Sequence, residues 1–591
     1  MENSSELTIS FQIKQAILQS LSGVFSSQRA GLHMEDIHLE HPADENHGDF
    51  ATNLALAFLK KNSSQLAKEN IKNPLELAQA ISQKIKLDFI KKIEVVKPGF
   101  INFWLTEDFL FCQLEEAIAK KGNYGRREAN GQKIMVEFAH PNTHKLFHIG
   151  HLRNITLGES ICRILEFGGY TIFRTNYQGD VGMHIAKCLW AIINTENYRE
   201  EINELKTLDQ KINFLGQAYT VGNKAYETDE KAKIEIHRIN EKIYTRDREI
   251  YVLWKQTRQW SLDYFDRIYR RLYTSFNRLY FESEVWESGK KIVLMFLKKG
   301  VFEKSEGAII FRGEKYGLHN RVFINSQGLP TYEAKDMGLG NLQFNDWQAD
   351  RYIHIVGPEQ SGYFEVVFKA LEFVKPEMKG KEYHRSYGWV RLKEGKMSSR
   401  AGNVVTGESL LEEAEIKLSS NFKFDFKEQD KERILEEIAI GAVKYSMLKY
   451  SPETEFVFDM QESISLDGNS GPYLQYTHAR CLSVLEKAKL GNDLQKTGLK
   501  FERLEAAEKA ILRKIYLFPE VVYDAAQRLS PNIICNYLYD LAQKYNLFYN
   551  EYPILRAEKK IKIFRVKLTL AVNQLLENGL FLLGIKAPEK M

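Results

Sequence analysis

The strongest constraint on the fold of this chain is a strand, a helix and a second strand in direct succession between residues 133 and 176. KIMVEFA (133–139) is short and mostly apolar, which is typical of a buried strand. HLRNITLGESICRILEF then places apolar residues three and four positions apart, which predicts a helix. Gly168 and Gly169 end this helix before a second strand, YTIFRTN. This βαβ order predicts a parallel sheet that binds its ligand at the carboxyl ends of the strands.

The turn between the first strand and the helix, PNTHKLFHIGHLRN, is rich in histidine. Together with His140, the histidines His144, His148 and His151 follow at spacings of four, four and three. Zinc ligands on one helix face can have such spacings. However, Pro141 separates the first two histidines, and no cysteine or carboxylate is spaced as in the HExxH zinc motif. Zinc is therefore a weaker interpretation than polar histidines of a turn.

A phosphate site is the better-supported interpretation of this turn. His148 and His151 lie three positions apart where the helix is expected to begin, and free backbone N–H groups at a helix N-terminus attract an anion. Lys145 adds a positive charge, and Gly150 has no side chain, so a flat ring such as adenine can approach the backbone. The two earlier histidines are then expected to be bystanders.

A second basic motif, RLKEGKMSSRAGNVV (391–405), follows a predicted strand. It is framed by Gly395 and Gly402 and contains lysines, arginines and two serines. A loop of this composition suits a lid that closes on a polyphosphate and stabilises its charge. A solvated basic loop is the alternative, and the HIGH sequence upstream favours the catalytic interpretation.

The rest of the chain divides into helical and strand-like segments. Residues 195–278 are rich in Glu, Lys, Arg and Tyr at helical spacing, which predicts a helical insertion with solvated faces. From about residue 408 the sequence is mostly helical, with Ser530 and Pro531 at a predicted helix start. The polar stretch 120–133 is a linker or an ordinary surface loop. Further strands are predicted at 308–312, 321–325, 351–357 and 384–392.

Composition narrows the class of protein. A length of 591 residues predicts two to four domains, and 44% hydrophobic with 27% charged residues is typical of soluble globular proteins. No apolar run is long enough for a bilayer, and the first residues lack a signal-peptide pattern. The five cysteines are scattered, which argues against a disulfide framework and fits a reducing cytosol. The net charge of +4 permits nucleic-acid binding through local patches without predicting it.

HIGH (148–151) together with KMSSR (396–400) resembles the two motifs of class I aminoacyl-tRNA synthetases. The flanking sequence is similar to the arginyl-tRNA synthetase family in VEFAHPNTHKLFHIGHLRN, TNYQGD, LPTYEAKD, HIVGPEQSGYF and MSSRAGNVV. NHGDFATNLA and KPGFINFWL resemble the family's N-terminal domain, and SLDGNSGPYLQYTHAR and LLGIKAPEKM its C-terminal part. The resemblance runs nearly from end to end and is weakest in the helical insertion.

The resemblance implies a multidomain α/β protein. Its expected parts are an N-terminal tRNA-contacting α+β domain (1–115), a linker (116–132), a Rossmann-like parallel-sheet catalytic domain (133–407) with a helical insertion (195–285), and a C-terminal helical region with an all-α anticodon-binding bundle (408–591).

The implied activity uses ATP, Mg²⁺, L-arginine and tRNA(Arg). The first step forms arginyl-adenylate and pyrophosphate, and the second transfers arginine to the 3′-terminal ribose of the tRNA. In-line attack of a carboxylate on the α-phosphorus depends on positioning and charge stabilisation, so no nucleophilic triad is expected. The resemblance further implies a cytoplasmic monomer that has no membrane partner and binds metal only as Mg²⁺ carried with ATP.

The motifs of the family also assign site residues to this sequence. The expected catalytic residues are His148, His151, Lys145 and Lys396. The expected ATP-binding residues are the same four with Gly150, Met397 and Ser398. The expected arginine-binding residues are Glu137, Asn142, Tyr332, Asp336 and Gln360. A guanidinium prefers planar carboxylate partners, which Glu137 and Asp336 can supply. Without the resemblance, Glu137 reads as a solvated strand end, Tyr332 as a core aromatic and Asn142 as a turn former.

Three C-terminal residues are expected tRNA contacts. Tyr476, Tyr549 and Met591 can stack or pack against bases, although buried helix positions explain the two tyrosines equally well. Two departures from the family pattern stand nearer the site. Ser399 replaces a second lysine of the class I loop, for which the upstream Lys145 is expected to compensate, and GDVGMH departs from the more frequent GDWGxQ, which leaves the role of His184 open.

Two other functions fit part of the sequence. A small nucleotidyltransferase also uses HxGH, but it would be far shorter and would lack KMSSR and a helical C-terminal region. A non-catalytic tRNA-binding paralogue would not need His148, His151, Lys145 and Lys396, all of which are present. The sequence therefore favours the enzyme over both.

Overall fold

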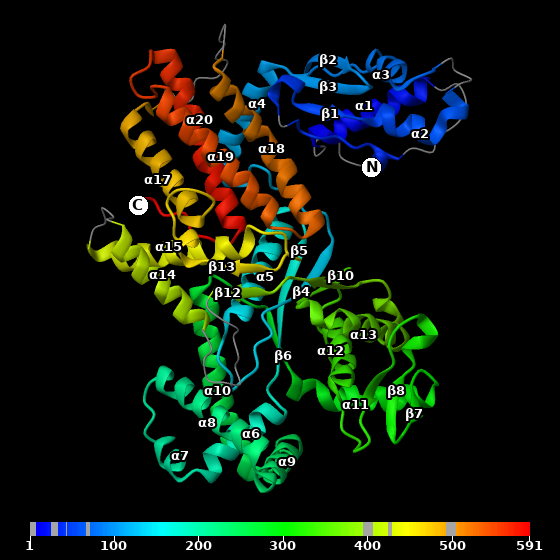
Figure 1. The fold of residues 1–591 in the computed structure, drawn as a ribbon, viewed down its shortest axis with the longest axis vertical. Helices are drawn as coiled ribbons and strands as arrows, with labels where there is room; N and C mark the ends of the chain where they lie inside the picture. Colours follow the sequence, from blue (N-terminus) through cyan, green and yellow to red (C-terminus); the bar gives the residue numbers. More distant parts are fainter. Residues whose placement is uncertain are drawn as a thin grey trace. The chain divides into compact units, whose positions relative to one another are not determined.

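The computed structural model describes residues 8–24, 33–42, 44–66, 71–393, 406–422, 428–491 and 504–591. The chain forms two compact units (Figure 1). Unit 1 comprises residues 1–127, 480–523 and 540–576, and unit 2 comprises residues 128–479, 524–539 and 577–591.

The centre of unit 2 is a sheet of five parallel strands in the order β11-β10-β4-β5-β6. Higher-numbered strands extend from β4 in both directions, so the strand order switches at the edge of β4. In sheets of this kind, ligands bind outside the carboxyl ends of the strands at the switch point. The strands are β4 (Lys133–Glu137), β5 (Thr171–Gln178), β6 (Arg278–Phe281), β10 (Arg351–Val356) and β11 (Glu382–Ser386).

The helices that connect these strands along the chain are α5 (Ile149–Phe167), α6 (Met183–Asn194), α7 (Glu196–Glu201), α8 (Leu208–Thr228), α9 (Glu230–Thr245), α10 (Arg248–Arg271), α11 (Glu282–Lys298), α12 (Tyr332–Asp346) and α13 (Ser361–Val374). After the sheet follow α14 (Gly407–Asn421), α15 (Glu428–Leu448) and α16 (Met460–Ser463). Four more helices carry residues of both units, namely α17 (Gly471–Ala488), α18 (Ala506–Arg528), α19 (Asn532–Glu551) and α20 (Lys559–Leu582).

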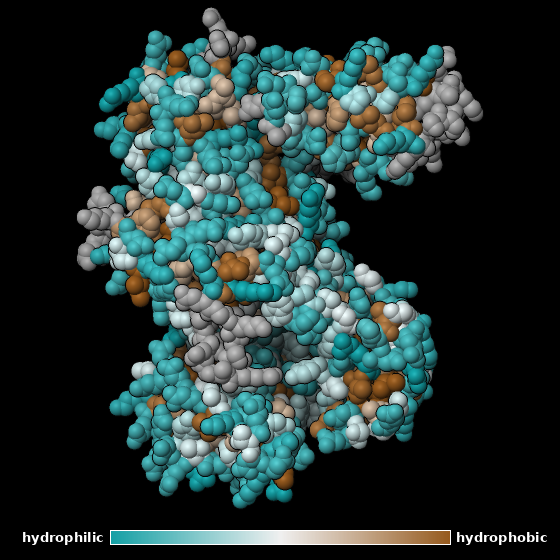
Figure 2. All heavy atoms as spheres, viewed as in Figure 1, coloured by the Kyte–Doolittle hydropathy of each residue, from teal (hydrophilic) through white to brown (hydrophobic). Residues whose placement is uncertain are grey.

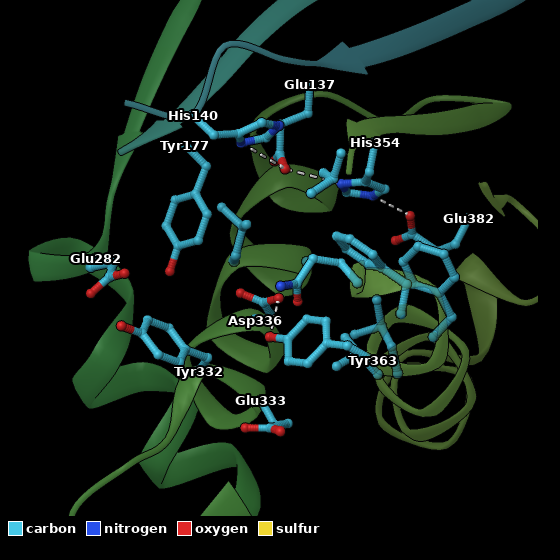
Figure 3. Close-up of a pocket in the computed structure, with 18 of the residues that line it drawn as sticks. Glu137, His140, Tyr177, Glu282, Tyr332, Glu333, Asp336, His354, Tyr363 and Glu382 are labelled. Carbon is cyan, nitrogen blue, oxygen red and sulfur yellow. Dashed lines mark hydrogen bonds and ion pairs between the residues drawn. The ribbon is translucent and has the colours of Figure 1, made fainter. Parts of the chain in front are cut away.

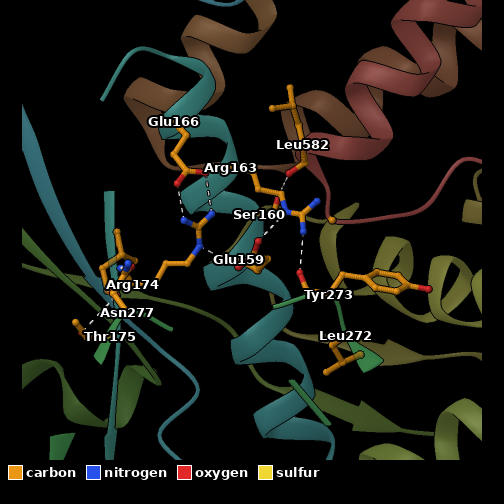
Figure 4. Close-up of polar contacts among 12 residues, drawn as sticks. Glu159, Ser160, Arg163, Glu166, Arg174, Thr175, Leu272, Tyr273, Asn277 and Leu582 are labelled. Atoms are coloured by element: carbon orange, nitrogen blue, oxygen red, sulfur yellow. Dashed lines mark hydrogen bonds and ion pairs between the residues drawn. The ribbon is translucent and has the colours of Figure 1, made fainter. Parts of the chain in front are cut away.

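Helix α5 links β4 to β5 and lies unusually close to the sheet. It is buried along most of its length at polar as well as apolar positions, and its Glu159 accepts hydrogen bonds from Arg163 and Arg174 (Figure 4). Gly158 permits this approach, because a Cβ there would lie 2.3 Å from the ring of Phe138, just after β4. The first turn of α5 is thereby held against the carboxyl end of the central strand.

Helices α11 and α12 cross with their backbones in contact. A Cβ at Gly289 of α11 would lie 2.0 Å from the carbonyl oxygen of Ala334, and a Cβ at Gly338 of α12 would lie 2.4 Å from that of Val285. Any larger residue must therefore push the helices apart. Because α12 begins at the carboxyl edge of the sheet, this crossing sets the position of its first two turns.

The substitution Gly338→Ala is expected to destabilise the protein by about 1–3 kcal/mol, the usual effect of forcing extra atoms into a packed core. Thermal unfolding measures the change as a lower Tm. Gly216→Ala on α8 is the matched control, because its Cβ would meet only Leu146 at an ordinary 3.8 Å. In an open helix site alanine is favoured over glycine, so the control should unfold at the same or a higher temperature. Equal Tm values for Gly338→Ala and the wild type would contradict the close crossing.

The helices between β5 and β6 are fastened to the sheet at one buried carboxylate. Asp180, just after β5, accepts a hydrogen bond from the Arg258 guanidinium of α10 at 2.7 Å. Its backbone carbonyl accepts a bond from the Trp254 indole N–H of α10, also at 2.7 Å. Ser283 at the start of α11 donates its backbone N–H to the same carboxylate at 2.8 Å. The helices between β5 and β6 are therefore held beside the carboxyl ends of the parallel strands.

Two small sheets complete unit 2. One is antiparallel, in the order β7-β8-β9, and the other pairs two parallel strands, β12 and β13. Their strands are β7 (Glu303–Ser305), β8 (Ala308–Phe311), β9 (Arg321–Ile324), β12 (Val390–Leu392) and β13 (Phe456–Phe458). Strand β12 ends immediately before residues 394–405, which lie outside the described part of the chain.

Unit 1 combines an antiparallel sheet, in the order β1-β3-β2, with helices. The buried Asp49 accepts the backbone N–H of Leu105 at 2.8 Å and pairs with Arg513 of α18 at 2.7 Å. Lys567 of α20 pairs with Glu115 of α4 at 2.5 Å. The elements from the N-terminal part are β1 (Phe50–Thr52), β2 (Ile90–Val96), β3 (Phe100–Leu105), α1 (Ile9–Val24), α2 (Leu54–Leu66), α3 (Pro74–Ser82) and α4 (Glu107–Lys120).

The predicted fold class is confirmed: a parallel-sheet domain with a helical insertion, an N-terminal α+β part and a helical C-terminal part. The segment 384–392, predicted as one strand, forms parts of two, β11 and β12. Helix α19 begins at Asn532, one residue after Pro531, which was predicted as its first residue with Ser530 as the N-cap. The domain boundaries proposed from the sequence stay a prediction. Figure 2 shows a largely hydrophilic surface, and no helix of the described residues is long and apolar enough to cross a membrane.

Candidate active site

Two pockets meet at the carboxyl end of β4, and both include Asn142 in their walls. We call the first, of about 530 Å³, the acidic pocket (Figure 3) and the second, of about 660 Å³, the histidine pocket. The carboxylates that line the acidic pocket are Glu137, Glu282, Glu333, Asp336, Glu359 and Glu382. The histidine pocket is lined by His144, Lys145, His148 and His151 together with residues of α8.

Asp336 of α12 is a buried carboxyl in the acidic pocket. The hydroxyl of Tyr363 donates to its Oδ2 at 2.6 Å. Burial raises the pKa of Asp336 to about 7, against the opposing effect of that hydrogen bond. Within the described chain no cationic side chain forms an ion pair with it. A cation bound in the pocket would supply the missing partner.

Glu282 and Tyr332 flank Asp336 in the same pocket (Figure 3). Glu282 begins α11 directly after β6, and its Oε2 lies 2.5 Å from Nζ of Lys335. Burial raises the pKa of Glu282, although the Lys335 ammonium opposes this. Tyr332 begins α12 and is 63% exposed, so its ring stands at the mouth of the pocket.

Glu137, at the end of β4, has a partner on each carboxylate oxygen. His354 Nδ1 lies 3.1 Å from Oε1, and the Gln343 amide donates to Oε2. Burial alone would raise the pKa of Glu137, but the charge and the hydrogen bond of His354 lower it below its usual value. His354 Nε2 in turn lies 2.7 Å from Oε2 of Glu382.

The two histidines expected to be bystanders have different surroundings. His140 lines the acidic pocket, with its Nδ1 3.9 Å from Oε1 of Glu137. His144 is buried in the wall of the histidine pocket, where its Nε2 lies 2.8 Å from Oγ1 of Thr257 on α10. No group of three or more side chains able to hold a metal ion occurs among the residues that the structure describes.

The histidine pocket contains the first turn of α5. The rings of His148 and His151 stack with centroids 3.8 Å apart. The Gly150 N–H donates to Nδ1 of His148 at 3.1 Å, and the His148 N–H donates to Nδ1 of His151 at 3.2 Å. Because each Nδ1 accepts a hydrogen bond, each neutral ring carries its proton on Nε2 and can donate from there. Gly150 allows this arrangement, since a Cβ would lie 2.9 Å from the His148 ring.

Both of these imidazoles are held neutral. Burial, together with the smaller effect of the nearby Lys145 ammonium, lowers the pKa of His148 to about 4. Burial also lowers the pKa of His151 well below its usual value, with the charges of its neighbours acting in the same direction. The pocket therefore offers neutral N–H donors beside one lysine, which suits a bound polyanion.

Helix α8 of the insertion forms the opposite wall of the histidine pocket. Its Tyr219 ring centroid lies 5.3 Å from Nζ of Lys145, within cation–π range. Asn213, Gln217 and Thr220 of the same helix line the pocket. No carboxylate occurs among the described residues of this lining, so the protein offers little for direct coordination of a hard divalent cation.

The structure brings most of the predicted site residues together. Lys145, His148 and His151 line the histidine pocket, with Gly150 beneath the His148 ring. The predicted arginine-binding residues Glu137, Asn142, Tyr332, Asp336 and Gln360 line the acidic pocket. Lys396, Met397 and Ser398 lie outside the described residues. Thr406, the first described residue after them, forms a β-bridge with His148.

The predicted tRNA contacts lie on or after the C-terminal helices. In unit 2, Tyr476 of α17 and the terminal Met591 are half-buried. In unit 1, Tyr549 of α19 is 39% exposed, with the Arg480 guanidinium 5.0 Å from its ring centroid.

Sequence reasoning missed several residues of the acidic pocket. Glu282 follows β6 directly, and a carboxylate just after a predicted parallel strand is a signal that could have identified it. His354 lies inside β10, where an ionisable residue in an otherwise apolar strand is a comparable signal. The lining role of His140 had no signal beyond its place after β4.

Comparisons with known proteins agree along the whole chain. Residues 11–105 match the family described as "Arginyl tRNA synthetase N terminal domain". Residues 113–460 match "tRNA synthetases class I (R), catalytic domain", and residues 474–591 match "DALR anticodon binding domain".

Individual relatives are similar over nearly their full length. A protein of Treponema denticola named arginine–tRNA ligase is 33% identical over 98% of this chain and 99% of its own. One of Bdellovibrio bacteriovorus with the same name is 34% identical over 89% of this chain and 91% of its own. The solved structure of Thermus thermophilus arginyl-tRNA synthetase superimposes with a TM-score of 0.80 at 25% identity, over 99% of this chain and 100% of that one.

Proposed function

This chain belongs to the class I arginyl-tRNA synthetase family and is an arginine–tRNA ligase, and on that premise we propose a role for each of its two pockets. The acidic pocket binds L-arginine and the histidine pocket binds ATP. The observation that carries this assignment is the buried Asp336 carboxyl, which lacks a cationic partner in the described chain. It lies in a pocket that shares Asn142 with a polyanion-binding helix start.

In the acidic pocket the guanidinium pairs with Asp336 and with Glu282, in place of the Glu137 expected from the sequence, because both carboxylate oxygens of Glu137 already bond His354 and Gln343. Both of the pairing carboxylates come from the beginnings of neighbouring helices, and Lys335 pairs with Glu282 while Tyr363 bonds Asp336. Tyr332 covers the substrate from the mouth of the pocket. Asn142 and Gln360 hold the amino and carboxylate ends, because both line the pocket and Asn142 also faces the ATP site. Glu137 contributes negative charge.

Arginine affinity should depend on pH through Asp336. In the free enzyme its pKa is about 7, whereas a bound guanidinium favours the carboxylate and lowers that value. Affinity is therefore full above pH 7 and falls as the pH drops below it, by up to about tenfold per pH unit, since binding must then release a proton. Calorimetry in buffers of different ionisation enthalpy between pH 5.5 and 8.5 measures both Kd and proton release. A Kd that is constant over this range would contradict the assignment.

ATP binds across the start of α5. The Nε2–H groups of His148 and His151 donate to phosphate oxygens, the helix N-terminus favours the negative charge, and Lys145 adds a cation. Mg²⁺ bound to the triphosphate would neutralise part of its charge. The described lining of the pocket would offer it neutral oxygens only, such as those of Asn142, Asn213 and Thr220.

The shared wall at Asn142 places the two substrates for in-line attack. The arginine carboxylate attacks the α-phosphorus, pyrophosphate leaves, and arginyl-adenylate forms. The hydroxyl of the 3′-terminal ribose of tRNA then attacks the arginyl carbonyl, and AMP leaves. Catalysis comes from positioning and from charge stabilisation by His148, His151 and Lys145. Lys396, Met397 and Ser398 are assigned to the same phosphates by their motif alone.

The remaining assignments concern the tRNA and the state of the protein. Tyr476, Tyr549 and Met591 contact tRNA(Arg) by stacking and packing, a role that suits the partial exposure of Tyr549. The protein acts as a cytoplasmic monomer. Sedimentation of the purified protein with and without tRNA measures its oligomeric state, which we expect to be monomeric.

Pyrophosphate exchange with each amino acid, with and without tRNA, tests the function. We expect exchange that depends on arginine and occurs only when tRNA(Arg) is present. Exchange with another amino acid would overturn the specificity. Binding of tRNA without exchange or charging would overturn the enzymatic assignment and favour a tRNA-binding paralogue.

A further inference from the structure

Three ionisable side chains form a row across neighbouring strands at the base of the acidic pocket. His354 of β10 and Glu137 of β4 are register partners, and Glu382 of β11 is the partner of Tyr352, two residues before His354 on the same face. The interior strands of a parallel sheet are ordinarily apolar. Burying charged groups there gives little stability even when they are paired, so this row needs a functional explanation.

The geometry fixes the protonation of the central histidine. Each ring nitrogen of His354 faces a carboxylate oxygen, Nδ1 at 3.1 Å from Glu137 and Nε2 at 2.7 Å from Glu382. Two carboxylates accept hydrogen bonds only if both nitrogens carry protons, so the ring is an imidazolium. The rings of Phe364 and Phe368, with centroids 5.5 and 5.4 Å away, limit its rotation.

The row continues to His140, which lies beside Glu137 in the wall of the pocket (Figure 3). Oε1 of Glu137, which is held by His354, also lies 3.9 Å from Nδ1 of His140. The other ring nitrogen of His140, Nε2, is buried, and the ring also interacts with the backbones of Ile355 and Tyr177. Glu382, His354, Glu137 and His140 thus form a chain that ends at the His140 ring in the pocket wall.

We propose that His354 is a positioning residue of the arginine pocket: clamped by Glu382, it holds Glu137 as a carboxylate and thereby orients His140 toward the bound amino acid. This proposal rests on the assignment of the acidic pocket to arginine. The titratable groups that face Glu137 and His354 are His140 after β4, Tyr177 on β5, Tyr280 on β6, Asp336 on α12, and Glu382 and His384 on β11.

The first test is His354→Asn, which keeps one hydrogen bond to Glu137 and removes the positive charge. We expect arginine to bind about tenfold more weakly at pH 7.5, the size typical of losing a group that orients a binding residue. The KM for ATP should stay within about twofold, because the histidine pocket is untouched. Without the imidazolium the pKa of Glu137 rises, so two carboxyls instead of one take up protons on acidification, and the Kd for arginine rises more steeply below pH 7 than in the wild type.

The second test, Glu382→Gln, should weaken arginine binding at high pH and not at low pH. The glutamine still accepts a hydrogen bond from His354, but the pKa of His354 falls because one of its two flanking carboxylates is gone. The imidazolium is then lost as the pH rises. Arginine affinity should therefore weaken by about threefold or more at pH 8.5 and remain near the wild-type value at pH 6.5.

His237→Asn is the matched control, since His237 is exposed on α9, contacts the Tyr226 hydroxyl at 3.4 Å and lines neither pocket. It should bind arginine with the wild-type pH profile. If His354→Asn lowers the Tm, its weaker binding can reflect lost stability, and the pH profile of Glu382→Gln then tests the proposal by itself. Wild-type pH profiles in both variants would overturn the proposal. A wild-type enzyme that fails to bind arginine would instead overturn the assignment of the pocket.

Discussion

Replacing Asp336 by asparagine is expected to raise the KM for arginine by about 10²- to 10³-fold at pH 8, because removing one partner of a buried charge pair usually costs several kcal/mol. The asparagine keeps the shape of the side chain and the hydrogen-bonding distance to Tyr363. The KM for ATP should change little, since Asp336 does not line the histidine pocket. Arginine-dependent pyrophosphate exchange in the presence of tRNA measures both constants.

The effect of this substitution should fade on acidification. Below a pKa of about 7 the wild-type Asp336 is itself protonated and resembles asparagine in charge. The ratio of the two KM values should therefore shrink by up to about tenfold for each pH unit below 7. Asp346→Asn at the far end of α12 is the control, because the same chemical change there affects the pairing with Arg278 at 3.6 Å and the contact with Tyr280, outside both pocket linings. A defect in ATP alone would contradict the assignment of Asp336.

Replacing Lys145 by methionine is expected to lower the rate of arginyl-adenylate formation by about 10²- to 10³-fold, the usual effect of removing one electrostatic contact to a developing charge. Methionine retains much of the length and apolar character of the lysine stem, so its packing against Tyr219 largely remains. We expect the loss in kcat, with a smaller change in the KM for arginine. Single-turnover formation of the adenylate with tRNA(Arg) present measures the chemical step directly.

A second lysine of unit 2 provides the control for this variant. Lys187 of α6 lies with its Nζ 4.1 Å from the ring centroid of Tyr226, an aromatic contact like that of Lys145, but it is not part of either pocket lining. Lys187→Met should therefore leave adenylate formation close to the wild-type rate. If both variants lose activity equally, the defect of Lys145→Met is one of folding and not of catalysis.

The sequence was sufficient for the parts of the site that are contiguous along the chain. The strand 133–137, the helix start at His148 and the second strand follow each other directly, so their periodicity predicts their order. The tautomers of His148 and His151 follow from the helix start, because the free N–H groups there select Nδ1 as the acceptor.

The fates of His140 and His144 could not be predicted from their spacing. The backbone enters the left-handed region at Ala139 (φ 79°), His140 (φ 44°) and His144 (φ 63°), which redirects the side chains of an irregular turn. One histidine therefore faces the acidic pocket and the other the core against α10. Regular spacing predicts direction only where the backbone is regular.

Glu282, the carboxylate of the acidic pocket that was not predicted from the sequence, illustrates a second limit of sequence-based prediction. Glu282 meets Asp336 only because β6 pairs with β5 after the long helical segment between them, and strand pairing across such a distance is a property of the folded sheet. The same holds for Tyr219, which reaches Lys145 from the insertion, whose role the sequence left open.

The contact between the backbones of α11 and α12 at Gly289 and Gly338 has a consequence for the choice of substrate. Glu282 is the first residue of α11 and Asp336 lies in the second turn of α12, so their separation from Asn142 is set by main-chain atoms that cannot yield as side chains do. The distance from these carboxylates to Asn142 is therefore fixed, and the pocket selects a substrate by its length. An analogue of arginine with one methylene more or fewer should lose more binding free energy than the methylene itself contributes, which is about 1–3 kcal/mol. The additional loss arises because the displaced guanidinium leaves a buried carboxylate unpaired.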